Sequence, residues 1–317
     1  QSVIWLDQAL QPGTPLYHIG FGLQLDGEIR ADLLQQAINH VANSHDALRL
    51  TLIETDGMPL QSVLTRVEIP LQQADFSGFD DGDARAQQFL QQQFQAPFDL
   101  FGGVLWHTWL VRASSSRSYW LMRFHHLITD GFGVALIGHP IAKTYNCLLR
   151  GEPLPDVGAP SYLDFIGEDQ QYLQSARYQR DQAFWLEQFP QLPPALFERR
   201  ATRLPLEAGI ETPHREHGGS GQHRWFLPRE LYCQVQALGG GSAAPVLLAA
   251  IATYFARTCQ AEQVVVGVPV HNRSGAAQKR TIGVFSSVNP IGIEVDLDAG
   301  FTQVMQTVSE QLRRCYR

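Results

Sequence analysis

The chain has 317 residues, which is more than one ordinary hydrophobic core and enough for two domains. It carries 24 basic and 31 acidic residues, a net charge of −7, and no basic run, so we expect no nucleic-acid partner. No apolar stretch approaches the ~20 residues that a transmembrane helix needs, so we expect no membrane partner either.

Four cysteines, at positions 147, 233, 259 and 315, are scattered along the chain without any CxxC pair. This pattern favours free thiols in a reducing compartment over a disulfide framework, and we therefore expect a cytoplasmic protein. Because the chain starts with Gln1 rather than Met, we also expect it to be a piece of a longer protein.

Strand and helix patterns alternate along the first half of the chain, which predicts an α/β fold. Strands are predicted at 17–25 and 48–53, and a strand pair at 104–112 and 119–124. Amphipathic helices are predicted at 31–44, 83–94 and 134–148. Pro140 lies inside the last of these helices and is expected to kink or restart it.

A Pro- and Gly-rich stretch at 151–160 predicts a boundary between an N-terminal lobe, 1–160, and a C-terminal lobe, 161–317. One long helix is predicted at 164–189, followed by a polar, irregular segment at 190–223. After it, strands are predicted at 223–227 and 264–270, and helices at 243–257 and 301–316.

Two adjacent histidines, His125 and His126, end the apolar run at 119–124, and Asp130-Gly131 then turns the chain into a helix. Side chains alternate across a strand, so one imidazole can face a cavity while the other packs. An imidazole at a strand end can act as a general base near neutral pH. A buried Asp130 needs a cation or several donors, and we predict an ion pair between Asp130 and Arg49.

Several familiar motifs are absent from the sequence. It contains no GxSxG nucleophile elbow and neither phosphate-binding glycine pattern, so we expect no covalent enzyme intermediate, ATP or dinucleotide. His126 would instead help one substrate to attack another directly. His214, His217 and His223 could suggest a metal site, but their spacing fits no zinc signature, so we expect a polar loop and no metal.

The segment HHLITDG at 125–131 resembles the HHxxxDG motif of nonribosomal peptide synthetase condensation domains. Further segments resemble that family's motifs in the same order: QSVIWLDQ at 1–8, HDALR at 45–49, PFDL at 97–100, YQRDQAFW at 178–185, GVPV at 267–270 and IGVF at 282–285. The resemblance implies two chloramphenicol-acetyltransferase-like lobes in a V-shaped pseudo-dimer. Family members continue past residue 317, so we expect the C-terminal lobe to be incomplete.

The resemblance also implies an activity, namely acyl transfer that forms an amide bond. A donor acyl or peptidyl thioester would react with an acceptor aminoacyl thioester, each delivered on the phosphopantetheine arm of a carrier domain, with no cofactor bound by the domain itself. The expected partners are donor and acceptor peptidyl carrier domains and a neighbouring adenylation domain. The domain itself is expected to be monomeric, in a synthetase that makes an antibiotic or a siderophore.

By the same resemblance, His126 accepts a proton from the attacking amine or hydrogen-bonds to it, and the Gly131 N–H polarises the oxyanion. His125, Asp130 and Arg49 are expected to support the motif structurally. The residues expected to line the substrate tunnel are Phe132, Ser286, Ser287 and Asn289. The serine at 287 replaces the family's usual asparagine, and a glycine at 292 replaces its usual arginine.

Three other activities stay open. The substitutions at 286–292 and the DGFG form of the motif also fit a condensation-like domain that modifies a carrier-tethered residue. In that reaction His126 would abstract an α-proton and water would be eliminated. The other two alternatives are a stand-alone acyltransferase that uses a soluble thioester and a non-catalytic domain that only docks carriers.

Overall fold

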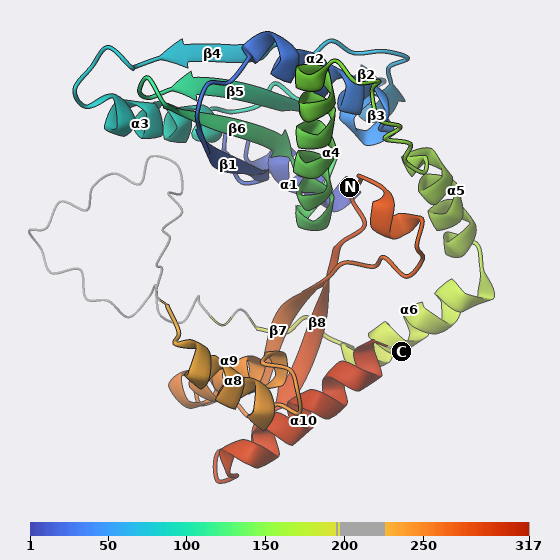
Figure 1. The fold of residues 1–317 in the computed structure, drawn as a ribbon. Coiled ribbons are helices and arrows are strands. Elements are labelled where there is room, and N and C mark those ends of the chain that lie inside the picture. The colour runs from blue at the N-terminus through green and yellow to red at the C-terminus, as the bar shows by residue number, and fades with distance from the viewer. Residues whose placement is uncertain (195, 197–225, 317) are drawn as a thin grey trace, which may run out of the picture. The chain divides into compact units, whose positions relative to one another are not determined.

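The computed structural model describes residues 1–194, 196 and 226–316 (Figure 1). The chain divides into two compact units, each described by itself below. The first contains Gln1–Leu173 and His271–Ser286, and the second contains Gln174–Val270 and Ser287–Arg317. This division falls later than the predicted boundary at residue 160. The sequence patterns also did not anticipate that residues 271–286 return to the first unit.

The first unit is built on a four-stranded sheet with the order β1-β6-β5-β4 (Figure 1). Its strands are β1 (His18–Asp26), β6 (Arg117–His125), β5 (Trp106–Arg112) and β4 (Leu71–Asp75). Strands β1, β6 and β5 are antiparallel neighbours, whereas β4 runs parallel to β5. Three of these strands match predicted ones, and β4 was not predicted.

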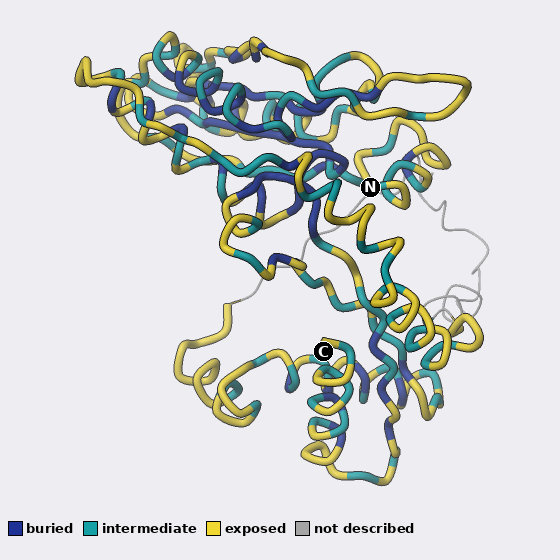
Figure 2. Tube along the Cα trace, turned by 90° about the vertical axis from the view of Figure 1, so that its right-hand side faces the viewer, coloured by how far each residue is buried: buried dark blue, intermediate teal, exposed yellow. Residues whose placement is uncertain are grey.

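Helices cover both faces of this sheet. On one face, Trp120, Met122 and Phe124 of β6 pack in a core with α2 (Ala31–Asn43) and α4 (Gly131–Arg150). On the other face, Leu121 and Trp109 pack under α3 (Gly82–Gln95). Side chains on both faces of β6 are therefore buried, and its apolar residues do not alternate with exposed ones. Figure 2 shows the buried residues gathered along the strands of this unit.

The remaining elements of the first unit are smaller. They are α1 (Ser2–Leu10), the 3₁₀ turn η1 (Asp46–Arg49), strands β2 (Leu50–Thr55) and β3 (Met58–Val63), α5 (Tyr162–Leu173) and the 3₁₀ turn η2 (Gln278–Arg280). Helix α4 runs through Pro140 as one helix, so it does not restart there, and it ends at Gly151 with φ of 65°. Glycine adopts this left-handed conformation readily, which explains the end of the helix at this position.

The second unit contains α6 (Ala176–Gln188), α8 (Arg229–Leu238), α9 (Ala244–Cys259), β7 (Gln263–Val270), β8 (Ser287–Glu294) and α10 (Phe301–Cys315). Strands β7 and β8 pair antiparallel and pack with α9 and α10 around a core that includes Val264 and Ile293. The long helix predicted at 164–189 is two helices, α5 and α6. They separate before Ser175, whose hydroxyl accepts the backbone N–H of Tyr178 and caps α6.

Some predictions concern residues that the structure does not describe. The cluster of His214, His217 and His223 lies outside the described residues, as does most of the strand predicted at 223–227. Within the described residues, no helix has the length and apolar character needed to cross a membrane. The same residues contain no group of three His, Cys, Asp or Glu side chains that could hold a metal ion.

Candidate active site

The two histidines of the motif lie where β6 leaves the sheet. His125 is the last residue of β6 and pairs with His18 of β1, and the backbone N–H of His126 donates to the carbonyl oxygen of Tyr17 at 2.8 Å. The pairing with β1 therefore continues through both histidines. His125 is fully buried, whereas His126 is half-buried.

Both ring nitrogens of His125 have a hydrogen-bond partner. Its Nε2 lies 3.4 Å from Oε1 of Gln8, and its Nδ1 accepts the backbone N–H of Leu127 at 3.2 Å. Burial lowers the pKa of His125 to about 3, with smaller contributions from His18 and His126. The ring therefore stays neutral and hydrogen-bonded, which suits a supporting residue rather than one that exchanges protons.

His126 has a different environment. Its Nδ1 is buried and makes no hydrogen bond within the described residues. His126 as a residue is half-buried, and of its two ring nitrogens only Nδ1 is enclosed without a partner in the described part of the chain. The ring of Tyr17 meets the ring of His126 edge-on, with centroids 6.5 Å apart and an interplanar angle of 86°. Nε2 is thus the nitrogen of His126 that a substrate can reach.

Asp130 is buried and accepts four hydrogen bonds. Its Oδ2 accepts from Nη1 of Arg273 at 2.7 Å and from the backbone N–H groups of Phe285 and Ser286, each at 3.0 Å. Its Oδ1 accepts the N–H of Gly133 at 2.8 Å, which caps helix α4. Burial by itself would raise the pKa of Asp130, but these donors outweigh it and hold the pKa below its ordinary value.

The predicted ion pair between Asp130 and Arg49 is wrong. Arg49 ends the turn η1, and its Nη2 bonds to Asp46, three residues earlier, at 2.8 Å. Its Nη1 donates to the carbonyl oxygens of Leu64 and Thr65. Local partners therefore occupy Arg49, and the cation that reaches Asp130 comes from much further along the chain.

That cation, Arg273, was missed by sequence reasoning. It lies three residues after the predicted strand at 264–270, and an arginine just after a predicted strand was the available signal. Its guanidinium lies over the rings of Phe132, at 4.7 Å, and Phe285, at 4.2 Å. Its Nη2 donates to the carbonyl of Gly283 at 3.2 Å. A Cβ at Gly283 would lie 2.2 Å from the ring of Tyr162, so only glycine fits there.

The other predicted site residues fall in both units. Gly131 begins helix α4, so its N–H belongs to the helix N-terminus, where backbone donors lack intrahelical partners. Phe132 follows it and is 37% exposed, and Ser286 contacts Asp130 through its backbone. These residues belong to the first unit with His126. Ser287 and Asn289 belong to β8 of the second unit, where the Ser287 hydroxyl lies 3.1 Å from Oδ1 of Asn289.

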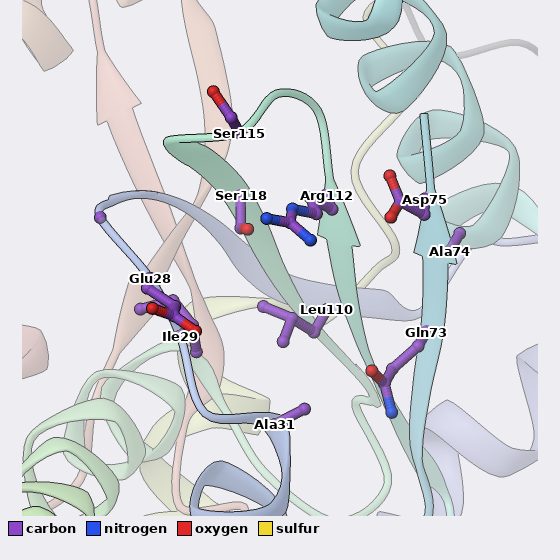
Figure 3. A pocket seen from close by; sticks show the side chains of 11 residues that line it. Glu28, Ile29, Ala31, Gln73, Ala74, Asp75, Leu110, Arg112, Ser115 and Ser118 are labelled. Carbon is purple, nitrogen blue, oxygen red and sulfur yellow. The ribbon is translucent and has the colours of Figure 1, made fainter. Parts of the chain in front are cut away.

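One pocket adjoins the motif and another lies away from it. A pocket of about 290 Å³ is bounded by His125, His18, α1 and the PFDL segment. A pocket of about 320 Å³, lined by residues that include Arg112, Asp75 and Ser118, is shown in Figure 3. Ser118 pairs with Leu25 at one end of β6, and His125 pairs with His18 at the other. The second pocket is therefore not part of the candidate active site.

Comparison with known proteins agrees with the geometry. The family model described as "Condensation domain" matches residues 1–317. The chain is 27% identical over 323 residues to a dimodular nonribosomal peptide synthase of Bacillus subtilis (strain 168), covering 100% of the chain and 13% of that protein. It is 29% identical over 327 residues to enterobactin synthase component F of Escherichia coli O157:H7, covering 100% of the chain and 24% of that protein. The chain thus spans a quarter or less of these relatives.

Solved condensation domains share the fold. The first condensation domain of the calcium-dependent antibiotic synthetase, in complex with a substrate analogue, matches with a TM-score of 0.77 and 25% identity, over 98% of this chain and 72% of that one. A mutant of the starter condensation domain of rhizomide synthetase, in complex with C8-CoA, matches with a TM-score of 0.81 and 26% identity, over 99% and 70%. With the HHxxxDG motif in place, the chain belongs to the condensation domain family of nonribosomal peptide synthetases.

Proposed function

We propose that this domain joins a donor acyl or peptidyl thioester to an acceptor aminoacyl thioester through an amide bond. The observation that carries the proposal is the accessibility of the two ring nitrogens of His126: Nδ1 is buried, and Nε2 is the one that a substrate can reach. The acceptor amine attacks the thioester carbonyl, so a C–N bond forms and the C–S bond breaks. Nε2 of His126 takes the amine proton or hydrogen-bonds to it, and the proton that the amine loses is passed to the leaving thiolate, which departs as a thiol.

The neighbours of His126 support this chemistry. Gly131 begins α4, and its N–H would stabilise the negative charge that develops on the carbonyl oxygen. Asp130 caps the same helix and is held by Arg273, so both would position the turn rather than touch the substrate. Holding the two thioesters in register would contribute more than proton transfer, because orientation alone can supply roughly 7–11 kcal/mol.

The assembly and its partners are proposed from the family. Two chloramphenicol-acetyltransferase-like lobes would form a V with the substrate tunnel between them, lined by residues that include Phe132, Ser286, Ser287 and Asn289. Donor and acceptor carrier domains would deliver their substrates on phosphopantetheine arms, and the domain would bind no cofactor of its own. The relatives that are multimodular synthetases support the proposal of carrier and adenylation neighbours.

Carrier-bound masses test this function. Donor and acceptor carriers, each loaded with a candidate substrate, are incubated with the protein and read by mass spectrometry. We expect the donor mass to move onto the acceptor carrier. We expect His126→Ala to slow this transfer by about 10²–10⁴-fold, the usual contribution of a positioned acid or base. His139→Ala is the matched control, because His139 is an exposed histidine of helix α4.

Two results would overturn the proposal. Loss of one water from a carrier-bound substrate, without transfer, would identify a domain that modifies a tethered residue. Equal transfer by the wild type and by His126→Ala would show that His126 takes no part in the reaction.

A further inference from the structure

Residues 1–8 make two hydrogen bonds to the motif region and one to Tyr17, which lies beside it. Nε2 of Gln1 donates to the carbonyl oxygen of Leu127 at 2.7 Å. The Oε1 of Gln8 lies 3.4 Å from Nε2 of His125. The carboxylate of Asp7 accepts the hydroxyl of Tyr17 at 2.7 Å, and Tyr17 in turn touches His126. The first ten residues of the chain therefore fix the surroundings of both histidines.

His126 lacks the bond that commonly orients a catalytic imidazole. The second ring nitrogen of such a histidine usually donates to a carboxylate or a backbone carbonyl, which fixes the tautomer and the ring rotation. In His126 the second nitrogen is Nδ1, and it makes no hydrogen bond within the described residues although it is buried. The orientation of the ring must therefore come from packing.

Tyr17 supplies that packing. Its backbone carbonyl accepts the N–H of His126 at 2.8 Å, which fixes the backbone. Its ring stands at 86° to the ring of His126, with centroids 6.5 Å apart, which restricts how the imidazole can turn. The same phenol ring lies 6.2 Å from the ring of His125, so it contacts both histidines of the motif.

Asp7 fixes the phenol in its turn. A hydroxyl that donates to a carboxylate makes a short, strong bond, and the 2.7 Å distance fits this type. The bond also raises the pKa of Tyr17 to about 12, so the phenol keeps its proton and donates throughout the neutral range. The other oxygen of Asp7 accepts Nε2 of Gln11 at 3.3 Å, which leaves the phenol bond undisturbed.

We propose that Asp7 and Tyr17 are positioning residues for His126. The carboxylate of Asp7 holds the phenol, and the phenol ring holds the imidazole with Nε2 directed to the attacking amine. This inference rests on the proposed function only in that His126 acts at the reaction centre. It assigns to the start of the chain a role in catalysis that its sequence does not reveal.

Four variants of the intact protein test the inference, with kcat and KM measured on loaded donor and acceptor carriers. Tyr17→Leu removes the ring, and we expect kcat to fall about 10²-fold with both KM values unchanged, because a small misplacement of a reacting group has this cost. Tyr17→Phe and Asp7→Asn each weaken or remove the charged hydrogen bond. We expect Tyr17→Phe, which removes the bond, to lower kcat by a few-fold factor, and Asp7→Asn, whose amide oxygen can still accept, to lower it by no more than that. The double variant is expected to be no slower than Tyr17→Phe alone.

Gln11→Ala is the matched control, because it removes a contact to Asp7 but leaves the bond to Tyr17 in place. Its kcat is expected to equal that of the wild type. Additive effects of Tyr17→Phe and Asp7→Asn would overturn the inference, as would effects confined to KM. If Tyr17→Leu does not fold, as judged by circular dichroism, the comparison of Tyr17→Phe, Asp7→Asn and their double variant still tests the inference.

The same measurements separate this inference from the proposed function. If His126→Ala transfers as fast as the wild type, the proposed function fails, whatever the Tyr17 variants do. If His126→Ala is inactive while Tyr17→Leu, correctly folded, keeps the wild-type kcat, the function stands and the positioning role of Tyr17 is rejected.

Discussion

Two arginines of the first unit are equally buried, but their charges are compensated differently. Arg273 is 2% exposed and forms an ion pair with Asp130 at 2.7 Å. Arg123 is 3% exposed and has no carboxylate partner within the described residues. It donates instead to the carbonyl oxygens of Gln93 and Ala96, and its Nη2 lies 3.0 Å from Nδ1 of His107.

Aromatic rings surround both guanidinium groups. Arg273 lies 4.2 Å from the centre of the Phe285 ring, and Arg123 lies 4.3 Å from that of Phe98. Burial without a carboxylate lowers the pKa of Arg123 to about 10. The comparison shows that rings and carbonyl groups are sufficient to hold a buried cation. The ion pair between Arg273 and Asp130 therefore serves to fix the turn that follows His126.

The largest effect is expected from Arg273→Ala. This change leaves the carboxylate of Asp130 buried without its cation, and breaking a buried pair in this way costs about 3–5 kcal/mol of the free energy of unfolding. Urea unfolding of the variant and the wild type measures the loss. We also expect peptide transfer to be lost, because the turn that begins α4 is no longer fixed.

Arg49→Ala is the control for this experiment, because Arg49 pairs with Asp46 and not with Asp130. The pair is near the surface, with side chains 15% and 19% exposed, and its loss is expected to cost about 1 kcal/mol. Similar losses in the two variants would contradict the assignment of Arg273 as the partner of Asp130.

The second effect is a decline in stability as the pH falls, caused by two histidines of the first unit. Burial lowers the pKa of His125 to about 3 and that of His107, beside Arg123, to about 4, from an ordinary value of 6.5. As the pH falls below 6.5, these two rings bind protons in the unfolded chain but not in the folded protein. The free energy of unfolding therefore declines by about 1.4 kcal/mol per pH unit for each ring. Asp130 has a lowered pKa and contributes only below its ordinary value of 3.8.

Urea unfolding at pH 7 and pH 5 measures this decline. Between pH 6.5 and pH 5 each of these two rings is expected to cost about 2 kcal/mol. His107→Gln removes one titrating ring and is expected to flatten the pH dependence, while Arg49→Ala, which alters no histidine, is expected to keep it. An unchanged slope in His107→Gln would show that His107 is not held neutral by the fold.

Apart from the control, the smallest effect is expected from Arg123→Met. The methionine keeps much of the apolar volume between the rings, and the groups left behind are neutral acceptors rather than a charge. We expect a loss of about 1–2 kcal/mol in the free energy of unfolding, from carbonyl groups that lose their donor. A loss as large as that of Arg273→Ala would remove the distinction between the two arginines.

The motif and its neighbouring elements could be predicted because their signals are local. The apolar run at 119–124 is buried on both faces of β6, and Val134, Ile137 and Ile141 lie on the buried face of α4. The partner of Asp130 could not be predicted in this way. Arg273 lies 143 residues further along the chain, and no spacing distinguishes it from the other arginines.

Sequence patterns also failed to predict features that depend on contacts with residues far away in the sequence. Strand β4 has one buried side chain, Leu71, and no alternating pattern, and it is held as a strand by parallel pairing with β5. The contact between Tyr17 and His126 joins two residues that are far apart in sequence, one just before β1 and the other just after β6. Tyr17 was predicted as the first residue of a strand at 17–25, and it lies just before β1. Nothing in its sequence context indicates which ring it contacts in the fold.

Because residues 271–286 belong to the first unit, that unit can complete its contacts only late in protein synthesis. A ribosome makes Asp130 long before Arg273, and Phe285 and Ser286 later still. At a synthesis rate of about 5–20 residues per second, Arg273 is added on the order of ten seconds after Asp130. During this time 174–270 of the second unit are synthesised. The first unit therefore starts first but finishes its core only after most of the chain has been made, and a ribosome stalled before residue 273 would carry an incomplete active site.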